Sequence, residues 1–297
     1  MKKGLIIKNV SNIYFIKSEE DIYRCVARGK LKSKEIVPVA GDIVQFKITD
    51  ANKKEAVIES IEDRKNYIKR PKCANISLII FVISAKLPKP DLLMLDKQLA
   101  FAEYINLKPI IIINKIDLDY NTAIKIKEEY TKIGYEVILT NALTGEGIKN
   151  IANKFKASKQ SIIALAGNSG VGKSALINSI FNENISQSGE VSNKSKRGKN
   201  TTTITSLFEI EKNVYIIDTP GFSTFDIDEI DYKQLDKFFI EFRKYITKCE
   251  FKGCSHIKEN ECFIKVAVEK QEISKQRYKN YAKIYNDLKY KGEHKKW

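Results

Sequence analysis

A glycine-rich segment of eight residues, Gly167 to Ser174, constrains this chain more than any other feature of its sequence. The segment fits G-x-x-x-x-G-K-[ST], follows the apolar run Ile162–Ala166 and precedes a helical pattern over 173–181. In a strand–loop–helix setting, such a loop turns its backbone N–H groups inward as an anion-binding nest at the positive end of the helix. We therefore expect nucleotide phosphates to bind at Gly167, Asn168, Ser169, Gly170, Val171, Gly172, Lys173, Ser174 and Ala175.

Two of these residues have specific chemical roles in such a loop. The ammonium of Lys173 is expected to reach the β- and γ-phosphates, and the hydroxyl of Ser174 to coordinate Mg²⁺.

A second motif, Asp-Thr-Pro-Gly, follows the apolar run Val214–Ile217. Its carboxylate, Asp218, is predicted to be the second ligand on the Mg²⁺ side of the site. Gly221 ends that segment and would offer its N–H to the γ-phosphate without a Cβ in the way.

A third motif, Asn114-Lys115-Ile116-Asp117, ends the apolar run Pro109–Ile113. A carboxylate placed there can accept two hydrogen bonds from guanine, whereas adenine lacks that pair of donors. Asp117 is therefore predicted to select the base, and Asn114 and Lys115 to brace the site. Together with the other two motifs it indicates a GTP-binding protein and argues against an ATPase or a kinase.

The order of these motifs along the chain is unusual. In ordinary small GTPases the base-reading motif comes last, whereas here residues 114–117 precede both 167–174 and 218–221. A circularly permuted GTPase domain explains this order, because permutation changes the connections and leaves the spatial neighbours in place. The segment after Gly221 then runs directly into the C-terminal region, which ties that region to the nucleotide state.

Residues 1–70 show a different pattern, with short apolar runs separated by polar clusters. Five strands without a helical period predict a small barrel, either an OB-fold or an SH3-like barrel. The runs are Leu5–Ile7, Ile13–Ile16, Ile22–Val26, Ile43–Ile48 and Ala56–Ile58.

From about residue 71 to 230, strand-length apolar runs alternate with amphipathic segments of helix length, which indicates a buried, largely parallel sheet. The expected strands are Ile76–Ile83, Pro109–Ile113, Val137–Leu139, Ile162–Ala166 and Val214–Ile217, and the expected helices are 91–106, 121–133, 146–155 and 173–181. Residues 231–297 read as helical around a cysteine cluster. The overall fold class is multidomain α/β: barrel, permuted GTPase domain (71–230) and helical C-terminal domain.

The cysteine cluster has the spacing C-x4-C-x-H-x5-C, formed by Cys249, Cys254, His256 and Cys262. Four soft or borderline ligands within 14 residues fit a closed tetrahedral zinc site. Because no position is left for water, we expect one structural, non-catalytic Zn²⁺ per chain.

The formal net charge of +15 is concentrated at the two ends, with +6 in residues 1–70 and +7 in residues 241–297. Basic flanks around a near-neutral middle favour polyanion-binding surfaces. No apolar stretch is long enough to cross a bilayer, and we see no export signal. We expect a cytoplasmic protein without a membrane partner, whose cysteines are thiols or metal ligands.

The motif order together with the cysteine spacing resembles one family, the ribosome small subunit-dependent GTPases RsgA, also called YjeQ. The resemblance covers nearly the whole chain. It implies a GTP-hydrolysing factor (GTP to GDP and phosphate) for late maturation of the 30S ribosomal subunit. It also implies nucleotide-dependent binding to 16S rRNA, and we expect a monomer.

The same resemblance assigns switch and base-loop residues. Residues 197–203 are similar to the family's R-G-[RK]-H-T-T-T segment, in which Thr202 would close on Mg²⁺ and the γ-phosphate beside Lys173 and Ser174. Asn200 stands where the family has His, and Phe222 stands where many GTPases place a water-orienting Gln. Asn141-Ala142 imperfectly matches the dipeptide of the last base-contacting loop.

A rival function belongs to a different class. A nucleotide-gated RNA-binding module, such as an RNA chaperone or a ribosome-silencing factor with incidental GTPase activity, would carry the same motifs. Multiple-turnover hydrolysis with and without 30S subunits separates the two.

Overall fold

The computed structural model describes residues 1–29, 37–155, 161–181, 205–218 and 227–294. Two sets of residues with predicted roles lie outside these ranges: Asn200 and Thr202 in one, and Gly221 and Phe222 in the other. Among the described helices, none is both long enough and apolar enough to span a membrane.

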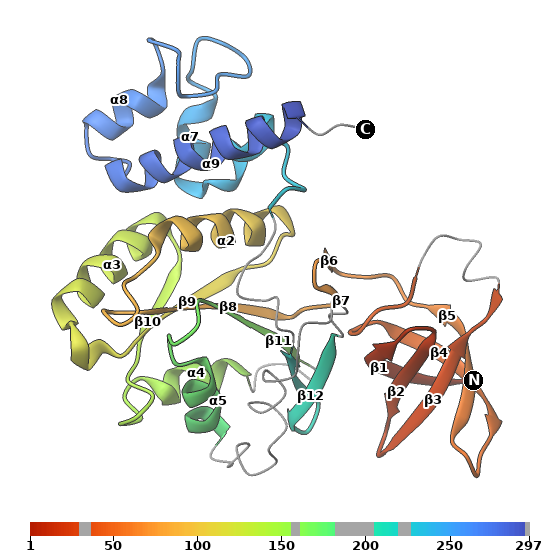
Figure 1. Ribbon diagram of the computed structural model, residues 1–297. Helices are drawn as coiled ribbons and strands as arrows, with labels where there is room; N and C mark the ends of the chain where they lie inside the picture. Colours follow the sequence, from red (N-terminus) through yellow and green to blue (C-terminus); the bar gives the residue numbers. More distant parts are fainter. Residues whose placement is uncertain (30–36, 156–160, 182–204, 219–226, 295–297) are drawn as a thin grey trace. The chain divides into compact units, whose positions relative to one another are not determined.

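The N-terminal region is a closed five-stranded barrel (Figure 1). Its strands follow the order β1-β2-β3-β5-β4, and β4 pairs back onto β1. The parallel pairing of β3 with β5 within an otherwise antiparallel barrel gives the OB-fold and excludes the SH3-like alternative. The strands are β1 (Lys2–Val10), β2 (Ile13–Ser18), β3 (Asp21–Ala27), β4 (Ile43–Asp50) and β5 (Glu55–Ile61).

Alternation along these strands sends every second side chain inward, as their half-buried sequences require. In β2 the inward side chains are Tyr14 and Ile16, and in β4 they are Val44 and Phe46. These residues form one apolar core with Ile6, Tyr23, Cys25, Ala56 and Ile58. The barrel therefore buries the apolar side chains on the inner face of its strands, whereas Ile22 and Val26 on the outer face of β3 are exposed.

A short hairpin follows the barrel and was not anticipated from the sequence. It consists of β6 (Tyr67–Lys69) and β7 (Lys72–Ala74), so it lies across the residue 70/71 boundary. The N–H of Ala74 donates to the carbonyl of Ala40 at 2.9 Å, which ties the hairpin to the barrel. Each of its two strands is only three residues long, which is too short to show an alternating pattern in the sequence.

The strands and helices between residues 78 and 139 form one half of the predicted α/β unit. Its strands follow the order β10-β9-β8, and β9 and β10 are parallel. Asp91 and Asp119 cap the two helices by accepting from the N–H groups of Met94 and Thr122. The elements are β8 (Leu78–Ser84), α2 (Leu92–Tyr104), β9 (Pro109–Asn114), the 3₁₀ turn η1 (Ile116–Leu118), α3 (Tyr120–Ile133) and β10 (Glu136–Leu139).

The remaining strands of the unit follow the order β11-β13-β12. The pairing of β11 with β13 is parallel, whereas β12, which the sequence patterns did not reveal, runs antiparallel to β13. The predicted parallel arrangement is therefore confirmed for the strands that carry motifs. The elements are α4 (Ile148–Phe155), β11 (Ser161–Ala166), α5 (Lys173–Phe181), β12 (Ser206–Glu211) and β13 (Val214–Asp218).

The C-terminal region is helical, as predicted, and packs around aromatic side chains. Phe239, Phe242 and Tyr281 are buried, with ring centroids 4.9 to 5.4 Å apart. The elements are the 3₁₀ segments η4 (Tyr232–Phe238) and η5 (Ile240–Phe242), then α7 (Arg243–Ile246), α8 (Phe263–Glu269) and the long α9 (Lys275–His294) (Figure 1).

Candidate nucleotide site and metal centre

The phosphate-binding segment has the backbone that its glycines predict. It leaves the buried strand β11 and enters α5 at Lys173. Gly167, Gly170 and Gly172 have φ values of 148°, 81° and 99°, a region that disfavours residues with a side chain.

Two of these glycines also permit close backbone approaches. A Cβ on Gly167 would lie 2.1 Å from the carbonyl oxygen of Val82, and one on Gly172 would lie 2.3 Å from Nδ2 of Asn114. The first contact sets the loop against the end of β8, and the second sets it against the base-reading motif.

Asn114 joins three loops at the carboxyl end of β9. Its Nδ2 donates to the carbonyl of Val171 at 2.9 Å. Its Oδ1 accepts from the hydroxyl of Thr140 and from the N–H of Ala142, both at 3.1 Å. Because the side chain is 1% exposed, these bonds form away from competing water. Asn114 therefore ties the base-reading motif to the phosphate-binding loop and to the loop after β10, and Thr140 is a further partner that no sequence pattern indicated.

Lys115 makes a second link between the base-reading motif and the phosphate-binding loop. Its backbone is left-handed, with φ of 60°. The ammonium donates to the carbonyl of Gly170 at 2.6 Å and to that of Leu87 at 2.8 Å. These two bonds hold the ammonium of Lys115 beside the phosphate-binding loop.

Asp117 lies in η1 with its side chain exposed, and no hydrogen bond to its carboxylate is found among the described residues. Its neighbour Ile116 is buried and anchors the turn. A carboxylate held on a fixed turn with free acceptor positions suits recognition of a donor pair on a base.

The loop after β10 is ordered by Asn141. Its side-chain oxygen accepts from the N–H of Leu143 at 3.0 Å, and its backbone carbonyl accepts from Gly145. Ala142 faces the base-reading motif through its N–H bond to Asn114. The loop that carries this dipeptide therefore lies beside the base-reading motif.

Lys173 folds back over its own loop. Its ammonium donates to the carbonyls of Gly167 at 2.7 Å and Asn168 at 2.9 Å, and burial lowers the pKa of this lysine. Ser174 follows on the first turn of α5 with its side chain exposed. Both side chains are positioned at the helix N-terminus, where phosphate oxygens and their cation bind in such loops.

Asp218 ends β13, which pairs in parallel with β11 in the register Ile163 to Ile216. Since parallel strands end at the same sheet edge, Asp218 emerges at the edge where the phosphate-binding loop begins.

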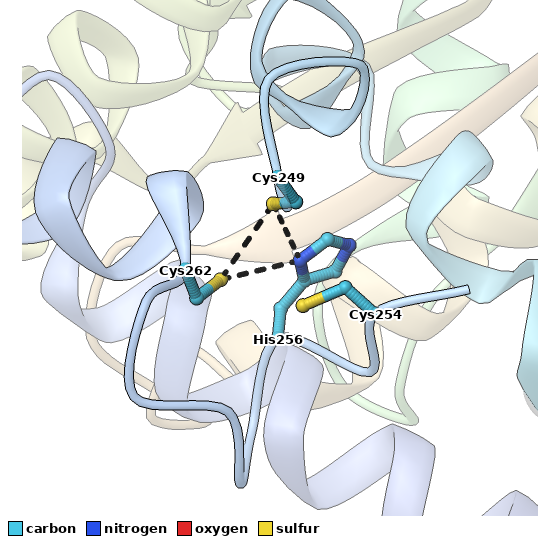
Figure 2. Close-up of side chains that lie close together, drawn as sticks. All are labelled: Cys249, Cys254, His256 and Cys262. Atoms are coloured by element: carbon cyan, nitrogen blue, oxygen red, sulfur yellow. Dashed lines mark hydrogen bonds between the residues drawn. The ribbon is translucent and has the colours of Figure 1, made fainter. Parts of the chain in front are cut away.

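The second site is the cysteine cluster, whose four ligand atoms lie within 4.8 Å of one another (Figure 2). Nδ1 of His256 lies 3.3 Å from the sulfur of Cys262 and 3.6 Å from that of Cys249, and the two sulfurs are 4.0 Å apart. A tetrahedral ion about 2.3 Å from each thiolate and about 2.0 Å from the imidazole has edges of about 3.5 to 3.8 Å. The cluster therefore has the size that such an ion requires.

Residues around the cluster fix the imidazole. Its Nε2 lies 3.4 Å from Oδ2 of Asp236, which leaves Nδ1 to face the sulfurs. A carboxylate on the second ring nitrogen is the usual outer partner of a metal-binding histidine. Asp236 lies 20 residues before His256, and no spacing rule in the sequence pointed to it.

The loop that carries His256 has its own support. The carboxylate of Glu259 accepts from the N–H groups of Ser255 and Ile257. Burial alone would raise the pKa of Glu259, but these hydrogen bonds outweigh it and lower the pKa to about 2. The hydroxyl of Tyr278 donates to the carbonyl of His256 at 2.7 Å. The loop is therefore held on both sides of the histidine by the protein itself.

Known proteins resemble this chain over nearly its whole length. Family models for the RsgA N-terminal domain and the RsgA GTPase match residues 3–58 and 61–228. Proteins named small ribosomal subunit biogenesis GTPase RsgA from Ruminiclostridium cellulolyticum and Clostridium beijerinckii are each 40% identical. These alignments cover 99% of this chain and 97% and 99% of the relatives.

Two solved structures share the fold. YjeQ from Thermotoga maritima superposes with a TM-score of 0.80 at 32% identity, covering 97% of this chain and 98% of its own. YloQ, described as a circularly permuted GTPase, has a TM-score of 0.77 at 29% identity, covering 100% and 97%.

The fold and the nucleotide site together define a circularly permuted P-loop GTPase with an N-terminal OB-fold barrel. The resemblance stated from the motifs is confirmed by the family models and by the full-length relatives. The chain belongs to the RsgA family of GTPases.

Proposed function

We propose that this protein is a GTP-hydrolysing factor in the biogenesis of the small ribosomal subunit. The observation that carries the proposal is the set of hydrogen bonds around Asn114. They join the base-reading motif to the phosphate-binding loop despite the permuted order. The names of the full-length relatives support the subunit as the place of action.

In this proposal each domain has one task. The barrel (1–70) binds 16S rRNA, the central domain (71–230) binds GTP, and the C-terminal domain (231–297) forms the second contact with the particle. The excess positive charge at both ends of the chain supports the two RNA contacts. The protein acts as a cytoplasmic monomer.

Two metal ions complete the proposal. One structural Zn²⁺ is held by the cluster of three cysteines and one histidine, whose dimensions fit tetrahedral coordination. Mg²⁺ accompanies GTP and is held by Ser174, Thr202 and Asp218. It supplies charge neutralisation during phosphoryl transfer. Lys173 stabilises the negative charge on the transferred group.

Hydrolysis by the free protein should be slow. Phe222 and Asn200 replace the side chains that orient or activate the attacking water in related GTPases. We expect the 30S particle to order residues 190–203 over the nucleotide and thereby raise the rate. Asn200→Ala should have a modest effect.

The test is pre-steady-state and multiple-turnover GTP hydrolysis with and without purified 30S subunits. A large rate increase on 30S particles, with weak turnover by the free protein, supports the proposal. Fast turnover without ribosomes that is lost in Asn200→Ala would make that position catalytic. An absence of stimulation would favour the RNA-binding module with incidental activity.

A further inference from the structure

Helix α2 has two buried faces, and each meets a different functional region. On one face, Leu95 and Gln98 line a narrow space together with Gly167 and Val171 of the phosphate-binding loop. On the next face lies Asp96, whose side chain is fully buried and points toward α9. A single helix therefore lines a space beside the nucleotide loop and also contacts the C-terminal helix α9.

The carboxylate of Asp96 collects hydrogen bonds from two other helices. Its Oδ1 accepts from Nη1 of Arg277 at 2.5 Å and from the hydroxyl of Tyr130 at 2.7 Å. Its Oδ2 accepts from Nδ2 of Asn280 at 2.6 Å. Arg277 and Asn280 both belong to α9 and lie three residues apart, so one residue of α2 bonds to two positions on the same face of the C-terminal helix.

Arg277 is itself only 1% exposed and bridges a second carboxylate. Its Nε and Nη2 donate to the two oxygens of Glu241 at 2.8 and 2.9 Å, and its guanidinium lies 4.6 Å from the ring centre of Phe239. A buried charge that loses one of its partners is strongly destabilised, because water cannot replace the partner. We call these hydrogen bonds of Asp96 and Arg277 the joint between α2 and α9. Because losing one of them strands a buried charge, the bonds should form or break together, as a two-state contact requires.

We propose that α2 couples the phosphate-binding loop to the C-terminal helices, with Asp96 as the positioning residue of the joint. The inference rests on the proposed binding of GTP at residues 167–175. A nucleotide that tightens the loop against α2 also favours the docked state of α9, and by linkage docking of α9 favours nucleotide binding. This route is distinct from the connection through the segment after Gly221.

The test measures amide hydrogen exchange over α9 in the full-length protein, with and without a non-hydrolysable GTP analogue and Mg²⁺. In the unaltered protein we expect the analogue to slow exchange in α9 about 5- to 10-fold. In Asp96→Asn this nucleotide-dependent ratio should fall below about twofold, and the affinity for the analogue should fall by a matching factor. A merely structural role would speed exchange equally with and without nucleotide.

The matched control is Lys97→Ala, one position along the same helix. Lys97 pairs with Asp287 of α9 at 3.4 Å, but both side chains are partly exposed, so the ratio should stay at its original value. Arg277→Lys is measured in parallel, since it keeps the positive charge but loses the bridge to two carboxylates. If Asp96→Asn does not fold, the same fall in the nucleotide-dependent exchange ratio is expected in Arg277→Lys, and an unchanged ratio there overturns the inference.

The inference would be overturned if the analogue slowed exchange in α9 by the same factor in the unaltered protein and in the folded variant. It would also be overturned if the unaltered protein bound the analogue without any slowing of exchange in α9. If the unaltered protein binds no analogue, the proposed function fails and this inference fails with it.

Discussion

The nucleotide site and the metal centre are built in opposite ways. The nucleotide site assembles loops that lie 57 residues apart along the chain, as the bond from Asn114 to Val171 shows. The metal centre takes all four ligands from within 14 residues and sits in loops between short helices. The strands and hydrogen bonds of the protein position the first site. The second has little regular structure between its four candidate ligands, so we expect its local stability to depend on a bound ion.

The largest effect is expected from a variant that disrupts the metal centre alone. Cys254→Ala removes one of four ligands, and structural zinc contributes on the order of 10 kcal/mol to the folding of such sites. We expect bound metal to fall from one per chain to none and the loop over 249–262 to lose protection. Elemental analysis and hydrogen exchange measure both effects.

The comparison requires that GTP binding by this variant largely survives, since the sheet that positions Asn114 and Lys173 contains no metal ligand. Unchanged metal content would contradict the ligand set. Complete loss of nucleotide binding together with the metal, beyond the 5- to 10-fold effect expected through α2 and α9, would show that the nucleotide site needs the metal centre in order to form.

The difference between the two regions also explains how much the sequence revealed. The four residues of the cysteine cluster were found from their spacing alone, because the cluster is local. The three GTPase motifs were found because each follows an apolar run that forms a strand, as at β9 and β11. The five barrel strands were found by alternation, but the choice between OB-fold and SH3-like barrel needed the pairing of β3 with β5.

What the sequence did not reveal depends on distant contacts. Thr140 and Asp236 support the two sites from other elements, and no local pattern links either of them to its partner. The strand β12 and the hairpin β6–β7 have weak or short alternation and form because neighbouring backbone is available to pair. No sequence pattern singled out Arg277, because its buried partners lie 36 and 181 residues away along the chain.

The second prediction concerns a substitution that removes a positive charge from the nucleotide site. Lys173→Ala deletes an ammonium that the loop holds half-buried, and a charge-assisted hydrogen bond to phosphate contributes up to about 3 kcal/mol. We expect GTP affinity to fall by about 100-fold. Fluorescent-nucleotide titration measures it, with metal content as the control. A variant that loses metal as well would contradict the independence of the two regions.

The third prediction changes the specificity of the nucleotide site without weakening its phosphate contacts. Asp117→Asn exchanges a double acceptor for a group with one donor and one acceptor, which should invert the preference from guanine to xanthine nucleotides. Competition between GTP and XTP reports the inversion. Retained preference for GTP would contradict the assignment of Asp117 as the base reader.

The smallest effect is expected from a variant that changes a neighbour of the metal centre and none of its four candidate ligands. Asp236→Asn keeps an acceptor near Nε2 of His256 but removes the negative charge, and losing an outer-shell partner of this kind lowers metal affinity by about 10-fold. All four ligands remain, so the metal should still be present at one per chain, and only competition with a chelator should reveal the difference. Glu259→Gln tests the loop support separately, because its oxygen can still accept from Ser255. Identical chelator competition in Asp236→Asn and the unaltered protein would mean that the ligands alone orient the imidazole, and that the metal centre is even more local than the structure indicates.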